Sequence, residues 1–266
     1  MSDDDARRAA DPTGPADERG GASAANDERG AGSGAAERGA DEREGVAGRL
    51  VLLAGGTSDA GRAAARALVA AGARVVVAGR DAAKLDALCA AVDGVASEVA
   101  DLTDEEAVGD LARRIRDRHG RVDGVLHLVG GWRGGGGLAG QTDADFRALE
   151  TSLTALRHVS RAFDEDLRAS SAGREAIVSS TAVAKPLAGG ANYAAVKAAA
   201  EAWTRAVGQG FAKAARDAGA EQSAAAVVFR VKALAGLEDA LADAFVALWD
   251  DDAASWHDAV IELAAP

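Results

Sequence analysis

From Arg49 onward, short apolar runs alternate with longer stretches rich in Ala, Leu and Arg, and this alternation strongly constrains the fold. Apolar runs without a polar face are typical of parallel strands buried on both sides, and the stretches between them suit helices. The sequence therefore predicts a single α/β domain built on a doubly wound parallel sheet with helices on both faces. Strands are expected at 50–55, 74–79, 94–100, 123–129, 175–180, 224–231 and 259–263, and helices at about 60–71, 82–92, 104–118, 143–169, 192–218 and 238–249.

The first 48 residues are predicted to be a disordered tail. They consist almost wholly of Ala, Gly, Asp, Glu, Arg and Ser, and Val46 is the only large aliphatic residue after Met1. Such a segment buries too little apolar surface to offset the entropy cost of ordering its backbone, about 1–2 kcal/mol per residue. The folded domain is therefore expected over residues 49–266.

Charge and cysteine content narrow the partners and the location. A net charge of −12 argues against nucleic acid or an anionic membrane as partner, because phosphate binding needs a clustered basic face. No stretch reaches ~18 uninterrupted apolar residues, so no membrane-spanning helix is expected. The acidic N-terminus argues against a signal or transit peptide. Cys89 is alone and cannot form an internal disulfide, and no metal site is predicted. We expect a cytoplasmic protein.

A glycine-containing turn joins the first predicted strand to the first helix. Gly55 and Gly61 bracket it, and glycine suits a backbone that takes φ > 0 or approaches a ligand closely. The amide groups and the positive dipole end of the helix would face a pyrophosphate, although the same turn could bind nothing. Asp59 is a candidate N-cap whose carboxylate would repel a nearby phosphate. The candidate pyrophosphate contacts are Gly55, Thr57, Ser58, Asp59, Ala60 and Gly61.

The end of the second predicted strand indicates which dinucleotide would bind. In such sheets an acidic residue there receives the ribose 2′-hydroxyl and rejects a 2′-phosphate. Here Gly79 stands at that position and Arg80 follows, and a guanidinium matches a phosphate with paired hydrogen bonds. The sequence therefore predicts NADP(H) rather than NAD(H). Alternatively, Arg80 only solvates the loop before Asp81, which is expected to cap the next helix.

Tyr193 and Lys197 form a Tyr-x-x-x-Lys pair early in a predicted helix, so both side chains lie on one face. Ser180 ends the fifth predicted strand, 13 residues before Tyr193. Carbonyl reduction needs an acid for the developing alkoxide, and a nearby ammonium favours the phenolate that results. In this interpretation Ser180 hydrogen-bonds the substrate oxygen, Tyr193 exchanges the proton and Lys197 lowers the pKa of Tyr193. A Tyr four residues before a Lys also occurs by chance in helices.

Taken together, these motifs resemble the short-chain dehydrogenase/reductase family, over essentially all of residues 49–266. The run from Ala54 to Gly61 resembles the family motif TGxxxGxG, with Ala54 in place of Thr and Asp59 in place of the middle glycine. The resemblance implies a Rossmann-like fold and an oxidoreductase that transfers a hydride between NADP(H) and a carbonyl or alcohol substrate. The implied catalytic residues are Ser180, Tyr193 and Lys197. Beyond the glycine turn, the implied cofactor contacts are Arg80, Asp101, Leu102, Val129, Gly130, Tyr193 and Lys197.

Three features depart from the family pattern. His127 begins the sequence His-Leu-Val-Gly where the family has Asn-Asn-Ala-Gly, and it is expected to replace a structural amide, with a proton carrier as the alternative. Ser152 or a neighbour stands where the family has an Asn that holds a proton-relay water. After the sixth strand the family's Pro-Gly and its mobile lid are missing. This implies an open site, a large or poorly selected substrate, or reduced activity.

Two further expectations concern the substrate and the assembly. The loop 130–140 contains four consecutive glycines, and Trp132 and Arg133 are candidates for a wall of the substrate pocket, unless Trp132 packs into the core. The helices that carry Phe163 and Trp203 resemble the family's subunit contact, so a homodimer or homotetramer is expected unless these aromatics only pack on the sheet. The departures leave an alternative function open, a dinucleotide-binding scaffold or redox sensor with weak or no activity.

Overall fold

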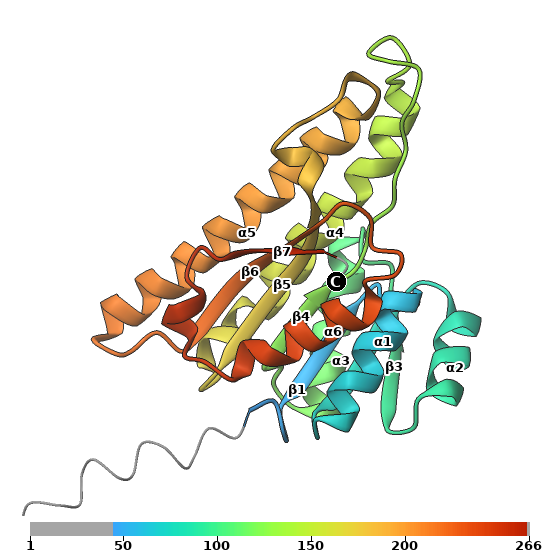
Figure 1. The fold of residues 1–266 in the computed structure, drawn as a ribbon. Helices are drawn as coiled ribbons and strands as arrows, with labels where there is room; N and C mark the ends of the chain where they lie inside the picture. The colour runs from blue at the N-terminus through green and yellow to red at the C-terminus, as the bar shows by residue number, and fades with distance from the viewer. Residues whose placement is uncertain (1–44, 265–266) are drawn as a thin grey trace, which may run out of the picture. The chain divides into compact units, whose positions relative to one another are not determined.

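The structure is a computed structural model that describes residues 45–264. A seven-stranded parallel sheet with the order β3-β2-β1-β4-β5-β6-β7 forms its centre (Figure 1). The winding direction reverses between β1 and β4, and the sheet is therefore doubly wound, as predicted. The strands are β1 (Leu50–Ala54), β2 (Arg74–Gly79), β3 (Val95–Val99), β4 (Gly124–His127), β5 (Gly173–Ser180), β6 (Ala224–Val231) and β7 (Val260–Leu263).

Successive residues of β1 point to opposite faces of the sheet, and each face therefore has its own core. Val51 and Leu53 pack with residues of α1, α2 and α6, whereas Leu50, Leu52 and Ala54 pack with residues of α3, α4 and α5. In Figure 1, α1 and α6 lie side by side over one face. The expected helices on both faces are confirmed. They are α1 (Asp59–Ala70), α2 (Ala82–Ala91), α3 (Glu105–His119), α4 (Asp143–Ala169), α5 (Ala191–Ala218) and α6 (Glu238–Val246).

Of the two predicted helix caps, Asp81 is confirmed and Asp59 is wrong. Asp81 accepts a hydrogen bond from the main-chain nitrogen of Lys84 and caps α2, as expected. The cap of α1 is Ser58, whose hydroxyl accepts from the nitrogen of Gly61 at 3.3 Å. Asp59 is instead the first residue of α1, with a side chain that is 75% exposed and paired with Arg62. Its charge is therefore turned to solvent and neutralised locally.

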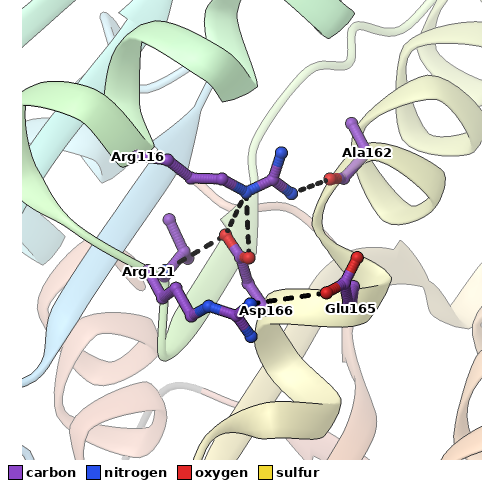
Figure 2. Close-up of polar contacts among 6 residues, drawn as sticks. Arg116, Arg121, Ala162, Glu165 and Asp166 are labelled. Atoms are coloured by element: carbon purple, nitrogen blue, oxygen red, sulfur yellow. Dashed lines mark hydrogen bonds and ion pairs between the residues drawn. The ribbon is translucent and has the colours of Figure 1, made fainter.

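A buried carboxylate joins α3 to α4 (Figure 2). The Asp166 side chain is 1% exposed, and its two oxygens accept hydrogen bonds from Nε of Arg116 at 2.9 and 3.1 Å. The nitrogen of Val122 lies 3.3 Å from Oδ2 of Asp166, and Arg116 also donates to the main-chain oxygen of Ala162 at 2.6 Å. These contacts tie α4 to α3, and removing one partner would leave a buried charge unpaired.

Residues 45–48, assigned to the tail by composition, pack on the domain. Val46 is 3% exposed and belongs to the core beside α1 and α6. The nitrogen of Gly48 donates to the oxygen of Gly72, and Nε of Arg49 donates to the oxygen of Gly45, both at 2.9 Å. The domain thus includes residues before the predicted boundary, because the aliphatic side chain of Val46 packs in the core. The remainder of the predicted tail lies outside the described residues.

The two aromatic residues expected at a subunit contact differ in burial. Phe163 is fully buried against the sheet, with the Arg116 guanidinium 5.8 Å from the centre of its ring. Its expected part in a subunit contact is therefore wrong, and the alternative, packing on the sheet, holds. Trp203 is half-buried, with the Arg157 guanidinium 5.5 Å from its ring.

No helix between residues 45 and 264 is long and apolar enough to cross a membrane.

Candidate active site

Two adjoining cavities lie along the carboxyl ends of the strands. The first, called here the β5 cavity, has a volume of about 1020 Å³ and lies at the ends of β4, β5 and β6. The second, the β2 cavity, has about 790 Å³ and lies at the ends of β1, β2 and β3. Doubly wound sheets bind ligands where the strand order reverses, which is where the cavities meet. The residues that line both are Ser58, Leu128, Val129, Gly130, Gly131 and Trp132.

The glycines of the first turn are required by close packing. Gly55 has φ +78°, and a Cβ atom there would lie 2.6 Å from Cγ2 of Val129. A Cβ atom at Gly61 would lie 1.8 Å from the main-chain oxygen of Gly56, so only glycine lets α1 start this close to the turn. Of the predicted pyrophosphate contacts, Gly55, Thr57 and Ser58 line the β2 cavity, whereas Asp59, Ala60 and Gly61 line neither cavity.

The β2 cavity brings together the residues predicted to choose and hold a dinucleotide. Arg80, Asp101 and Leu102 all line it, as does Lys84, which the sequence analysis did not single out. The Thr103 hydroxyl and nitrogen donate to Oδ1 of Asp101 at 2.7 and 2.9 Å. These hydrogen bonds hold the pKa of Asp101 below its usual value, and the Arg80 charge adds a smaller effect in the same direction. The cationic side chains of Arg80 and Lys84 thus both line the β2 cavity.

The three predicted catalytic residues line the β5 cavity together. Ser180 ends β5, while Tyr193 and Lys197 lie one turn apart near the start of α5. Burial raises the pKa of Tyr193, and a hydrogen bond with Ser180 partly offsets this effect. Nζ of Lys197 lies 5.8 Å from the centre of the Tyr193 ring and donates a hydrogen bond of 2.7 Å to the oxygen of Val178. Burial dominates this shift, so the phenol keeps its proton at neutral pH, and the lowering expected from Lys197 remains a prediction.

A buried ionic network that the sequence did not reveal lies next to Lys197. Burial lowers the pKa of Lys197 to about 8, and the charge of Glu201 opposes this shift. Glu201 accepts hydrogen bonds from Ser179 at 2.7 Å and from Nε and Nη2 of Arg230 at 2.8 and 2.6 Å. The carboxylate, one turn along α5, is thus held in place and helps Lys197 remain protonated at neutral pH.

His127 ties the end of β4 to α4. It is buried, its Nε2 lies 3.2 Å from the main-chain oxygen of Ser152, and its Nδ1 has no hydrogen-bond partner among residues 45–264. Burial and then the charge of Lys197 lower the pKa of His127 to about 3, so the ring is neutral. Because a carbonyl only accepts, Nε2 carries the proton. The Ser152 hydroxyl donates to the oxygen of Leu149 within α4 at 2.8 Å. The contact between Nε2 of His127 and the main-chain oxygen of Ser152 agrees with the structural role expected for His127.

The glycine-rich loop is attached to the loop before α5. Nε2 of Gln141 donates to the oxygens of Gly189 at 2.9 Å and Gly135 at 3.1 Å, and its Oε1 accepts from the nitrogen of Asn192 at 3.1 Å. Nothing in the sequence pattern indicates this clamp, since it depends on residues about 50 positions apart. Trp132, on the same loop, is 66% exposed and lines both cavities. Its packing into the core, the alternative stated above, is therefore wrong.

A family model described as short chain dehydrogenase matches residues 49–215. The chain belongs to this family. Short-chain dehydrogenases are oxidoreductases that use nicotinamide cofactors, so these coarser expectations from the motifs are confirmed.

Two curated relatives come from Streptomyces. A protein of Streptomyces sp. (strain C5), to which daunorubicin C-13 ketoreductase activity is ascribed, is 40% identical over 92 residues, 33% of this chain and 32% of that protein. A Streptomyces virginiae protein, assigned as the ketoacyl reductase of the monensin polyketide synthase, is 34% identical over 167 residues, 60% of this chain and 64% of that protein. The chain thus spans less than two-thirds of the length of either relative.

Solved structures confirm the Rossmann-like fold of this short-chain dehydrogenase. Levodione reductase has a TM-score of 0.70 at 20% identity, covering 81% of this chain and 95% of its own. NAD⁺-bound xylitol dehydrogenase has a TM-score of 0.72 at 17% sequence identity, covering 83% of this chain and 99% of its own. A Shigella flexneri 2a protein assigned to the family and complexed with NADP has a TM-score of 0.71 at 19% sequence identity. The match also covers 83% of this chain and 99% of that protein. At these identities the likeness is one of fold.

Proposed function

We propose that this short-chain dehydrogenase is an NADP(H)-dependent reductase that converts a ketone or aldehyde to an alcohol through Ser180, Tyr193 and Lys197. The observation that carries the proposal is that these three side chains line one large cavity, which opens into a second cavity lined by Arg80. The pairing of a proton donor with an adjoining dinucleotide-sized groove is what carbonyl reduction requires.

The joined cavities suit a nicotinamide dinucleotide. Gly55, Thr57 and Ser58 would hold the pyrophosphate, and Arg80 with Lys84 would hold a 2′-phosphate. Gly130 lies where an added Cβ would be 3.6 Å from Nζ of Lys197, so the absence of a side chain leaves room beside this ammonium. When bound, the cofactor supplies a hydride for the carbonyl carbon. The further proposed contacts are Asp101 and Leu102 with the adenine, and Val129, Gly130, Tyr193 and Lys197 with the nicotinamide ribose.

Ser180 and Tyr193 act on the carbonyl oxygen. The Ser180 oxygen accepts a hydrogen bond from the nitrogen of Ala182 at 3.2 Å, and its own proton, which hydrogen-bonds Tyr193 in the free protein, is donated to the substrate oxygen. Tyr193, protonated because burial raises its pKa, gives its proton to the oxygen as the carbon is reduced. Lys197, anchored on Val178, stabilises the phenolate that Tyr193 becomes. The protonated phenol favours reduction over alcohol oxidation at neutral pH.

The relatives point to the substrate class. One is named as a daunorubicin C-13 ketoreductase and the other as the ketoacyl reductase of a polyketide synthase, so both names describe the reduction of a keto group. The β5 cavity, at about 1020 Å³, has room for a large substrate. Only the short link of residues 232–237 connects β6 to α6, and residues 232–235 of this link line the cavity. We therefore propose a bulky ketone as substrate.

The test is NADPH oxidation by the purified protein with a panel of aldehydes, ketones and quinones that includes aromatic polyketide ketones. Turnover of any of them that depends on Tyr193 supports the proposal. NADPH binding without reduction of any compound would favour the alternative, a dinucleotide-binding scaffold or redox sensor. A homodimer or homotetramer remains a prediction, and sedimentation at micromolar concentration tests it.

A further inference from the structure

The charge of the β5 cavity is opposite to that of the chain. The chain has 42 acidic residues against 30 lysines and arginines. Nevertheless, no acidic residue of the described chain lines this cavity. Lysine is scarce in the sequence, which has five, and three of them line the cavity: Lys185, Lys197 and Lys232. His127, the remaining titratable base there, is neutral because burial lowers its pKa to about 3.

Two of these lysines are free of internal partners. Lys197 donates a hydrogen bond to the main-chain oxygen of Val178. Lys185 and Lys232, by contrast, form neither an ion pair nor a hydrogen bond with any residue in 45–264. The two lysines outside the cavity, Lys84 and Lys213, each pair with an acid of their own helix or its cap. Lys185 precedes α5 and Lys232 follows β6, so the two exposed cations reach the cavity from different loops.

The large exposed side chains of the cavity other than these lysines are apolar. They are Leu187, which is 78% exposed, and Trp132, which is 66% exposed. Val231 and Leu234 also line the cavity but are less exposed. Among the described residues, four large apolar side chains are more than half exposed, and these include both Leu187 and Trp132. Exposed apolar side chains gathered at a concave site mark a surface that an apolar ligand covers.

From these observations we propose that the substrate is a carbonyl compound with an apolar body and an anionic group, either a carboxylate or a phosphate. The carbonyl meets Ser180 and Tyr193, the apolar body covers Trp132 and Leu187, and the anion pairs with Lys185 and Lys232. The reaction part rests on the proposed function. The recognition of the anionic group does not rest on the proposed function, because it concerns the binding of the ligand and not its reduction.

The experiment compares three aromatic ketones of the same body: 6-acetyl-2-naphthoate, its methyl ester, and 6-acetyl-2-naphthyl phosphate. Binding to the full chain is measured by calorimetry with and without NADPH. The anions should bind more tightly than the ester, and salt should reduce the difference. Lys185→Met and Lys232→Met should each weaken anion binding about fivefold, the upper end for solvent-exposed ion pairs, and leave ester binding unchanged. Lys213→Met, with the same charge change outside the cavity, should alter neither.

Equal affinity for the ester and both anions overturns the inference. So does a loss of NADPH affinity in Lys232→Met with probe binding unchanged, because that result assigns Lys232 to the cofactor phosphates. The carboxylate and phosphate arms identify which anion is preferred. If the anions bind through the lysines but no probe is reduced, the proposed reaction fails while the inference stands. If acid and ester are reduced with equal kcat/KM, the reaction stands and the inference fails.

Discussion

Nζ of Lys197 donates a hydrogen bond of 2.7 Å to the main-chain oxygen of Val178, and this contact holds the ammonium within 5.8 Å of the Tyr193 ring centre. Burial lowers the pKa of Lys197 to about 8, so its charge is present well below that value and is lost as the pH rises through it. If the charge stabilises the tyrosinate, kcat should fall as the pH passes about 8. A profile of kcat across neutral and alkaline pH measures this.

Glu201→Gln provides the matched variant for this pH dependence. Its carboxylate raises the pKa of Lys197, so removing the charge should move the alkaline fall of kcat to lower pH. A profile that stays in place, or moves upward, would contradict the assignment of the fall to Lys197.

Arg80→Ala should change the choice of cofactor. A hydrogen bond to a charged group contributes about 1.5–3 kcal/mol, so NADPH affinity should fall about 10- to 150-fold. NADH affinity should change little, because it has no 2′-phosphate. Arg133→Ala is the control, since Arg133 lines the same cavity but faces Asp145 at 4.0 Å. Fluorescence titration gives both affinities, and equal affinity of the unmutated protein for NADH and NADPH would end this interpretation.

Glu175 should make the protein less stable as the pH rises. This buried carboxyl group has one oxygen bound to Ser160 at 2.6 Å and the other without a partner among residues 45–264. Burial raises the pKa of Glu175 to about 7, whereas the unfolded value is about 4.3. The folded state therefore keeps a proton that the unfolded state releases, and stability declines between these two pH values.

Glu175→Gln removes that titration. The variant should lose less stability than the parent between pH 5 and pH 8, by about 2–3 kcal/mol. Urea denaturation at the two pH values measures the free energy of unfolding of each protein. Parallel losses in the two proteins would show that another group is responsible.

Removal of the N-terminal tail should be harmless only up to Glu44. Residues 1–44 offer no large aliphatic side chain after Met1, so deleting them should leave the melting temperature unchanged. Deletion of residues 1–46 also removes Val46 from the core and should lower the melting temperature by about 2–6 °C. Val46→Ala should act in the same direction. Calorimetry that finds both deletions equally stable would show that Val46 contributes nothing.

Sequence and structure agree where the interactions are local or repeated, and differ where they join distant residues. The strands were predictable because their apolar runs match burial on both faces of a parallel sheet. Val46 was missed because composition averages over a segment, whereas one side chain is enough to anchor it. The Gln141 clamp and the Glu201–Arg230 pair depend on side chains that only the fold brings together. Phe163 was misplaced because a helix pattern alone did not show which face covers the sheet.

Tyr193→Phe distinguishes a catalyst from a scaffold. The change keeps the ring and its packing but removes the proton donor, and general acid catalysis contributes about 10²- to 10⁴-fold, so turnover should fall by that factor. NADPH affinity should change far less, because the lining of the β2 cavity is untouched.

The same variant also reports the state of the phenol directly, because Tyr193 is the only tyrosine of the chain. Tyrosinate absorbance in a pH titration therefore comes from this one residue, and it should vanish in Tyr193→Phe. Because burial raises the pKa of Tyr193, the midpoint in the free protein should lie above the usual value of about 10. A midpoint below 10 would mean that Lys197 dominates over burial and would favour alcohol oxidation. If the variant also kept the full reductase rate, Tyr193 would not be the acid and the scaffold alternative would gain support.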